Sequence, residues 1–354
     1  MFIFDGRNGA IPAVPLAVLK GTLYGTTFGG GGAGCGRSGC GTVFGLPIGG
    51  KQRVLYRFGG SSQTFPSGLT VLNGTLYGTT NYGGTGCGFG CGTIFSVTPA
   101  GKERVVYRFK ATPDGQYPNG LTALNDTLYG TTYFGGSSDR GAVYSLTAGK
   151  ERVFYSFKGG SDGALPAAPL TVLNGTFYGT TSAGGSGCSG YGCGTVFSIT
   201  TAGEERVLYS FPDIGNVVGP QPGVLTALNG VLYGTTYYGG TGGSRGCGTV
   251  FSITTAGVES VLYNFNCTGV TVGPSGLTVL NGALYGTTQF GGSADAGTIF
   301  RITTAGNESV LYNFEHPGGV YPEARLTRLK GTLYGTTTRG GSSHRDGTVF
   351  AFTP

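Results

Sequence analysis

Short runs rich in Val, Ile, Leu, Thr, Tyr and Phe recur along the chain between turns and loops rich in Gly. In the stretch from Gly68 to Phe109 these runs are residues 68–72, 75–80, 92–98 and 104–109. Runs of this composition, bounded by Gly, Pro and Asn, predict β-strands. Asn73-Gly74 joins the first two runs, and this dipeptide predicts a type I′ hairpin because the turn needs positive φ at both central residues. We therefore expect four antiparallel strands in this stretch.

The same order of predicted strands returns along the whole chain. Each copy carries Tyr-Gly-Thr-Thr, which begins at Tyr24, Tyr77, Tyr129, Tyr178, Tyr233, Tyr285 and Tyr334. A period of roughly 50 residues indicates a repeated supersecondary unit. No helical pattern lies between the strands, and four antiparallel strands in each of seven repeats predict an all-β fold, a single seven-bladed β-propeller over residues 1–354.

The predicted strands are apolar with little alternation, which suits a blade covered on both faces by its neighbours. For the Gly of Tyr-Gly-Thr-Thr the sequence leaves two explanations open. It lets adjacent sheets approach closely, or it marks a β-bulge.

The two ends of the chain complement each other. The seventh repeat stops at Pro354 after three strands, whereas Phe2-Ile3-Phe4 aligns with the fourth-strand residues Tyr56-Arg57-Phe58. We expect the N-terminal strand, residues 1–5, to be the outermost strand of the last blade. This closure leaves no open sheet edge at the junction.

Composition excludes several classes of protein. Gly accounts for 74 residues without a three-residue period, which excludes collagen. Aromatic residues make up 12% and charged residues only 11%, unlike a disordered chain. No apolar run approaches the ~20 residues of a transmembrane helix. The net charge of +6 is spread over single Lys and Arg residues, so we expect no nucleic-acid partner.

The eight cysteines favour disulfides and an oxidising compartment. The expected pairs are Cys35–Cys40, Cys87–Cys91, Cys188–Cys193 and Cys247–Cys267. Zinc binding is the alternative for the close pairs, but zinc sites of the usual kinds bring two such pairs together, often with His. The only His residues are His316 and His344, so we expect no metal. For Cys247 and Cys267, an intermolecular bond remains the alternative.

The repeat resembles known families. Its order of strands is similar to that of quinoprotein-type and kelch-type propellers. More specifically, the recurring Leu-Asn-Gly-Thr-Leu-Tyr-Gly-Thr-Thr, Gly-Gly, Cys-Gly-Thr-Val-Phe and Val-Leu-Tyr-Ser-Phe segments resemble the GloVer (Gloeobacter/Verrucomicrobia-type) tandem repeat. That resemblance implies a bacterial exported protein, extracellular or on the cell surface, and implies no reaction. Met1 to Gly6 is not a signal segment, so we expect that the numbering starts at a processed end.

Candidate catalytic groups are sparse. Quinoproteins stack their cofactor on a Trp, and this chain has none, so we expect no cofactor. Asp139, Asp295 and Asp346 share one loop position, where they form either a carboxylate cluster or, more simply, turns that brace loops lacking cysteines. A Ser-His-Asp triad would need His316 or His344, and we expect neither to act as its base. We expect no catalytic residues and no enzyme.

One set of residues has binding character. It is the position just before each loop Gly-Gly, occupied by Phe28, Tyr82, Phe134, Ala183, Tyr238, Phe290 and Arg339. These side chains either form a binding or interface ring on one face of the propeller, or simply cover the neighbouring loop. The low charge and the abundance of Gly, Ser, Thr and Tyr favour a non-catalytic extracellular structural protein that self-associates into a fibre, coat or other surface assembly. The alternative is a propeller that binds a carbohydrate, a polysaccharide or another surface ligand. An uncharacterised hydrolase or lyase comes third.

Overall fold

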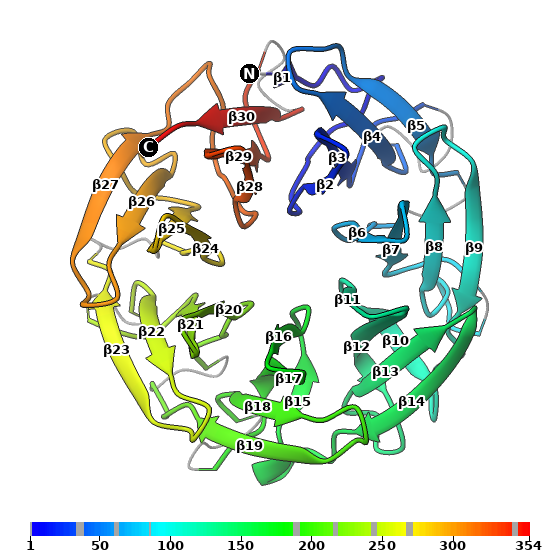
Figure 1. Ribbon diagram of the computed structural model, residues 1–354, viewed down its shortest axis with the longest axis vertical. Coiled ribbons are helices and arrows are strands. Elements are labelled where there is room, and N and C mark those ends of the chain that lie inside the picture. Colours follow the sequence, from blue (N-terminus) through cyan, green and yellow to red (C-terminus); the bar gives the residue numbers. More distant parts are fainter. Residues whose placement is uncertain are drawn as a thin grey trace.

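The computed structural model of the protein describes residues 2–32, 39–59, 64–84, 86–186, 192–214, 219–241, 246–266, 272–341 and 346–354. The chain forms seven antiparallel sheets arranged as blades around a central axis (Figure 1). This all-β, seven-bladed β-propeller is the predicted fold. Apart from the strands, the described residues contain one short 3₁₀ helix, Gly160–Asp162.

Each blade begins at the axis and ends at the rim. Blade 1 consists of β2 (Ala17–Leu19), β3 (Thr22–Thr27), β4 (Thr42–Pro47) and β5 (Arg53–Arg57). Blade 2 consists of β6 (Thr70–Leu72), β7 (Thr75–Thr80), β8 (Thr93–Val97) and β9 (Glu103–Arg108). Blade 3 consists of β10 (Gly115–Pro118), β11 (Thr122–Leu124), β12 (Thr127–Gly135), β13 (Ala142–Thr147) and β14 (Lys150–Ser156). Blade 4 consists of β15 (Ala164–Pro166), β16 (Thr171–Leu173), β17 (Thr176–Ala183), β18 (Thr195–Ile199) and β19 (Glu205–Ser210).

The other three blades follow the same plan. Blade 5 consists of β20 (Thr226–Leu228), β21 (Val231–Thr236), β22 (Thr249–Ile253) and β23 (Glu259–Asn264). Blade 6 consists of β24 (Thr278–Leu280), β25 (Ala283–Thr288), β26 (Thr298–Ile302) and β27 (Glu308–Asn313). Blade 7 consists of β28 (Thr327–Leu329), β29 (Thr332–Thr337), β30 (Thr348–Phe352) and β1 (Phe2–Ile3).

The N-terminal strand closes the ring as predicted. β1 lies antiparallel to β30, with Phe2 opposite Val349 and Ile3 opposite Thr348, and both chain ends lie in blade 7 (Figure 1). Phe4 then packs edge-to-face on Phe44 of blade 1, with ring centroids 5.1 Å apart. Equivalent aromatic pairs join the other blades, for example Phe58 with Phe95 at 5.2 Å. The junction between the chain ends therefore uses the same contact as every other blade interface.

The glycine of Tyr-Gly-Thr-Thr accommodates an aromatic ring of its own blade. A Cβ on Gly234 would lie 2.5 Å from Cζ of Phe251, the residue directly opposite it on β22. The register shift of this blade lies elsewhere, between Val250 and Phe251 where β22 pairs with β23. Neither explanation left open by the sequence is right, because the glycine makes room for a cross-strand ring within one sheet.

The two threonines that follow this glycine link strands and blades. In blade 5 the first, Thr235, donates a hydrogen bond to the Ser275 carbonyl of blade 6 (3.3 Å). The second, Thr236, shares a hydrogen bond with Thr249 of the neighbouring strand (2.9 Å between hydroxyl oxygens). The motif therefore has three structural roles. Its glycine leaves space for an aromatic ring, its first threonine makes a hydrogen bond to the next blade, and its second makes one within its own blade.

A further hydrogen bond joins the blades at the axis. The first residue of the innermost strand donates its hydroxyl to a Leu carbonyl of the next blade at 2.5–2.7 Å. The six donors are Thr70, Thr122, Thr171, Thr226, Thr278 and Thr327. Blade 1 has Ala17 at this position, so it has no hydroxyl to give to blade 2.

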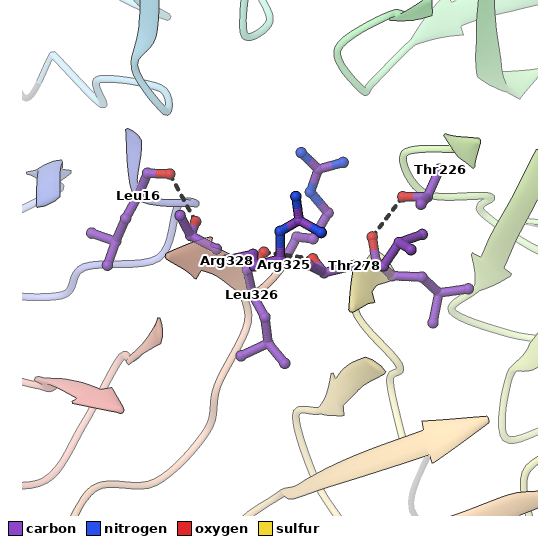
Figure 2. Close-up of a pocket in the computed structure, with 9 residues that line it drawn as sticks. Leu16, Thr226, Thr278, Arg325, Leu326 and Arg328 are labelled. Atoms are coloured by element: carbon purple, nitrogen blue, oxygen red, sulfur yellow. Dashed lines mark hydrogen bonds between the residues drawn. The ribbon is translucent and has the colours of Figure 1, made fainter. Parts of the chain in front are cut away.

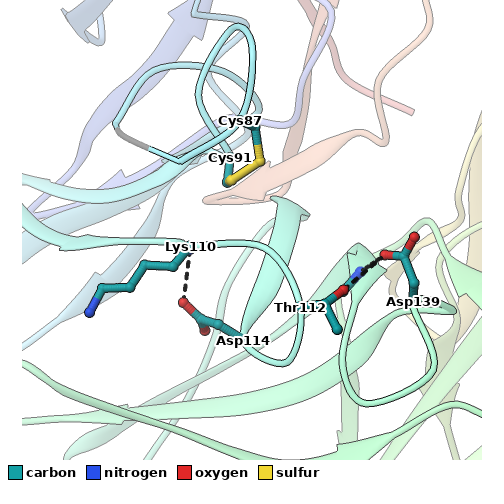
Figure 3. The surroundings of a disulfide bond; sticks show 7 residues. Cys87, Cys91, Lys110, Thr112, Asp114 and Asp139 are labelled. Atoms are coloured by element: carbon teal, nitrogen blue, oxygen red, sulfur yellow. Dashed lines mark hydrogen bonds between the residues drawn. A yellow bond between two sulfur atoms is a disulfide. The ribbon is translucent and has the colours of Figure 1, made fainter.

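The loops between the second and third strands are braced in two ways. Cys87 and Cys91 form a disulfide in blade 2, with Cα atoms 5.1 Å apart (Figure 3). Cys40, Cys193 and Cys247 are also in disulfides, whereas their predicted partners Cys35, Cys188 and Cys267 lie outside the described residues. In blades 3 and 6 a carboxylate takes the place of the disulfide. Asp139 accepts a hydrogen bond from the Gly135 amide, and Asp295 accepts one from the Gly291 amide, both at 2.8 Å.

Candidate functional site

A hollow of about 740 Å³, here called the funnel, lies at the axis. Its wall is built from the segments that precede the innermost strands and from the residues that follow Tyr-Gly-Thr-Thr. The seven blades surround this axis, and the innermost strand of each blade is only three residues long (Figure 1). The volume falls within the range of about 300–1,000 Å³ that is usual for small-molecule sites.

Polar side chains line the funnel at one repeated position. The residue directly after Tyr-Gly-Thr-Thr contributes Asn81, Tyr133, Ser182 and Tyr237 to the wall. Ser182 donates its hydroxyl to the Leu165 carbonyl (2.8 Å). Among the residues that the structure describes, the side chains of Asn81 and Tyr133 make no hydrogen bond, so their polar groups remain available for a ligand.

A hydrogen-bond network connects this position across three blades. The Tyr237 hydroxyl donates to Oε1 of Gln289 (3.0 Å), and Nε2 of Gln289 donates to Oε1 of Glu323 (2.7 Å). The hydroxyl of Thr338 also reaches Oε1 of Glu323 (3.4 Å). Desolvation at the wall raises the pKa of Glu323, and these two hydrogen bonds and the charge of Arg339 act in the opposite direction. The network fixes Tyr237 and Glu323 in the wall of the funnel.

Two arginines from blade 7 lie at the funnel or beside it. Arg325 lines the funnel and also a smaller recess of about 230 Å³ beside the innermost strands. Arg328, on β28, lines the same recess. Figure 2 shows both side chains extending from blade 7 in the same direction, beside the hydrogen bonds of Thr226 and Thr278.

The strongly perturbed carboxyl groups lie away from the funnel, on the outer strands. Burial raises the pKa of Glu151 to about 7 and that of Glu205 to about 7. Glu205 accepts a hydrogen bond from the Tyr155 hydroxyl of the preceding blade (3.0 Å). These groups join neighbouring blades at the rim. Among the described residues, no group of three His, Cys, Asp or Glu side chains is arranged to hold a metal ion.

The predicted ring of aromatics mostly lies outside the funnel. Of the predicted residues Phe28, Tyr82, Phe134, Tyr238, Phe290 and Arg339, only Phe28 belongs to its wall. The others include rings that pack on the loop of the adjoining blade. Tyr82 lies between Phe65 and Tyr117 with centroids 5.6 and 5.3 Å away, and Tyr117 contacts Phe134 at 5.9 Å. Phe290 packs on Tyr321 at 5.4 Å, and the Arg339 guanidinium lies 5.7 Å from the same ring.

The residues predicted from the sequence to form a binding ring lie one position after those that line the funnel. In six repeats a residue stands between Tyr-Gly-Thr-Thr and the predicted ring residue, and it is polar every time: Asn81, Tyr133, Ser182, Tyr237, Gln289 and Thr338. Blade 1 lacks this residue, so Phe28 follows Thr27 directly and takes its place at the wall. The consistent polarity of that position in an otherwise apolar repeat is the signal that could have identified the site.

This geometry defines a seven-bladed β-propeller with a ligand-sized axial funnel. The Gloeobacter/Verrucomicrobia repeat matches residues 1–191, 86–256 and 186–354, and the chain therefore belongs to this repeat family. No curated protein matches the chain.

Several solved structures share the fold. A putative 6-phosphogluconolactonase from Bacteroides uniformis is 12% identical, with a TM-score of 0.55 over 90% of this chain and 93% of that one. A chain from a study of two prolyl endopeptidases is 12% identical, with a TM-score of 0.57 over 97% of this chain and 50% of that one. A puromycin hydrolase is 14% identical, with a TM-score of 0.63 over 98% of this chain and 52% of that one. At these identities the similarity shows the fold alone.

These neighbours correct one expectation. The sequence led us to expect that the chain is not an enzyme, and that inference was wrong. All three similar propellers carry enzyme names, so a propeller without a familiar catalytic motif is not thereby non-catalytic. The physical reason is that a fold is held by its packing pattern, whereas reactive groups can change residue by residue on the same scaffold.

Family and chemistry also bear on the compartment. Membership of the repeat family and the Cys87–Cys91 disulfide fit an exported protein. No helix in the described part of the chain is long and apolar enough to cross a membrane.

Proposed function

We propose that this protein acts outside the cell or at its surface and binds a carbohydrate in the axial funnel. The observation that carries this proposal is the polar lining at one repeated position, in a hollow of about 740 Å³. Sugars present hydroxyl groups together with flat apolar patches of ring carbon. Asn81 suits the hydroxyl groups, and the rings of Tyr133 and Tyr237 suit the apolar patches.

A matched pair of adjacent tyrosines tests the proposal. Tyr237 lines the funnel, whereas Tyr238 does not, and both belong to the same loop. We expect the protein to retain oligosaccharides on a glycan array, and we expect Tyr237→Ala to weaken binding by about tenfold, the equivalent of ~1.4 kcal/mol. Tyr238→Ala should leave the affinity within about twofold of that of the unmodified protein. Equal losses in the two variants, or no glycan retained by the unmodified protein, would refute binding in the funnel.

A second candidate function, self-association into a surface assembly, is favoured by the outer strands of blades 5 and 6. Large apolar side chains are exposed there, with Val261 at 48%, Val310 at 52% and Tyr312 at 45% of full exposure. Contact between such strands of two copies would bury this apolar surface.

Electron microscopy and sedimentation test this candidate on protein purified without reductant. Filaments or sheets that are abolished by Val310→Lys and kept by Ser309→Lys would support self-association through β27. A single monomeric species at micromolar concentration would refute it.

A further inference from the structure

Two positions beside the axis depart from the sevenfold repeat in blade 7 only. The residue before the Leu that leads into each innermost strand is small or apolar in six blades: Pro15, Gly68, Gly120, Pro169, Val224 and Gly276. Blade 7 has Arg325 there. The middle residue of the innermost strand is also apolar in six blades: Val18, Val71, Ala123, Val172, Ala227 and Val279. Blade 7 has Arg328 there, so two positive charges replace apolar residues within four positions of the chain.

Arg325 has no counter-charge in the described part of the chain. No described residue forms an ion pair or a hydrogen bond with its guanidinium, and the Cδ of its stem lies 3.5 Å from where a Cβ on Gly276 would be. Burial alone lowers its pKa. Glu323 is close in sequence, yet its Oε1 is engaged by Gln289 and Thr338. A cation withdrawn from water without a partner costs stability, and groups of this kind mark candidate binding sites.

The polar groups of the recess that remain free are hydrogen-bond donors, which suit an anion. Its threonine hydroxyls are committed to carbonyl oxygens of the next blade, as in the bonds from Thr226 to Leu277 and from Thr278 to Leu326. No carboxylate lines it. The guanidinium groups of Arg325 and Arg328 are therefore its uncommitted donors, and a guanidinium binds carboxylate or phosphate oxygens in a bidentate, charge-assisted manner.

We infer that the funnel takes an acidic saccharide, and that Arg325 and Arg328 hold its carboxylate or phosphate group in the recess that they both line. The hydroxylated body of the ligand then lies in the funnel, beside Asn81, Tyr133 and Tyr237. This inference rests on the proposed carbohydrate binding and adds the charge of the ligand and the residues that select it.

The repeat itself supplies conservative variants for the test. Arg325→Val introduces the residue type that blade 5 has at this position, Val224, and Arg328→Val introduces the type that blade 6 has, Val279. Arg301→Ser is the control, because it removes one exposed positive charge from β26, where blade 5 has Ser252. Calorimetric titrations of the full chain with trigalacturonic acid, cellotriose, glucose 6-phosphate and inorganic phosphate compare the four proteins.

We expect trigalacturonic acid or glucose 6-phosphate to bind at least about tenfold more tightly than cellotriose, and each Arg→Val change to remove that preference. The two acidic probes distinguish a carboxylate from a phosphate as the anionic group. Arg301→Ser should bind as the unmodified protein does. The preference should also weaken as salt is raised, since it is electrostatic. In addition, Arg325→Val should melt no lower than the unmodified protein, because it removes a half-buried charge that has no partner among the described residues.

The outcomes separate this inference from the proposed function. If cellotriose binds as tightly as the acidic probes and the arginine variants are unaffected, carbohydrate binding stands and the anion site is refuted. If only inorganic phosphate binds, and only while both arginines are present, the anion site stands without a saccharide. If none of the four probes binds the unmodified protein, both ideas are refuted.

Discussion

Tyr144 provides a sharp test of how the blades pack. It is fully buried at a position where the other blades have Phe44, Phe95, Phe197, Phe251, Phe300 and Phe350. Its hydroxyl has no hydrogen-bond partner and lies 2.5 Å from where a Cβ on Gly130 would be. Leaving a buried polar group unpaired costs about 1–3 kcal/mol, so Tyr144→Phe should stabilise the protein by about that amount. With an unfolding entropy of about 2.1 cal/mol/K per residue, the midpoint temperature should rise by about 1–4 °C.

Thermal and urea unfolding measure the change, and blade 2 supplies the reciprocal control. Phe95→Tyr places a hydroxyl in the equivalent closed site above Gly78 and should destabilise the protein by a similar amount. The reasoning is refuted if Tyr144→Phe lowers the stability. That result would mean that a buried water joins the hydroxyl to Oδ1 of Asp114 or Oε1 of Glu151, which are likewise buried without a partner.

Two further predictions concern the contacts between blades. Ala17→Thr supplies the hydroxyl that blade 1 lacks, for the Leu69 carbonyl of blade 2. It should therefore raise the free energy of unfolding by about 1 kcal/mol in urea; a decrease would show that this junction has no room for the bond. The raised pKa of about 7 at Glu151 and at Glu205 means that the folded state holds these protons more tightly than the unfolded state, whose value is near 4.5. The resulting stabilisation is complete below about pH 4 and is lost as the pH rises through 7. The midpoint temperature should therefore fall between pH 5 and pH 8, and the double variant Glu151→Gln/Glu205→Gln should flatten that slope. An unchanged slope would contradict the raised pKa of Glu151 and Glu205 as the cause of this pH dependence.

Much of the fold could be predicted because each repeat specifies it independently. Asn73-Gly74 predicts its hairpin, and the structure has φ of 50° and 73° at these residues. The match between Phe2-Ile3-Phe4 and Tyr56-Arg57-Phe58 predicts the closing strand. The function of the repeated glycine could not be predicted in this way. It depends on a side chain that lies opposite in the sheet but far along the chain, and only the strand register identifies that partner.

The site was harder to predict for a different reason. A pattern shared by all repeats reports on packing, and the ring of Tyr82, Phe134 and Phe290 proved to consist largely of packing contacts between loops. The funnel is instead marked by the position after Tyr-Gly-Thr-Thr, which is polar in six repeats, as at Asn81, and by the two arginines with which blade 7 departs from the other blades. Whether a neighbouring position faces the axis or the adjoining loop depends on the twist of the blade, which sequence spacing alone does not give.

The division of blade 7 between the two chain ends has an evolutionary consequence. Duplication or deletion of a whole repeat from the middle of the gene leaves β1 and β30 unchanged, and with them the Phe4–Phe44 contact that closes the ring. Recombination between repeats can therefore alter the number of blades without disturbing the closure. The width of the axial opening can then change in single steps, one blade at a time. Each added blade also brings one more set of residues to the axis, where new side chains can be acquired.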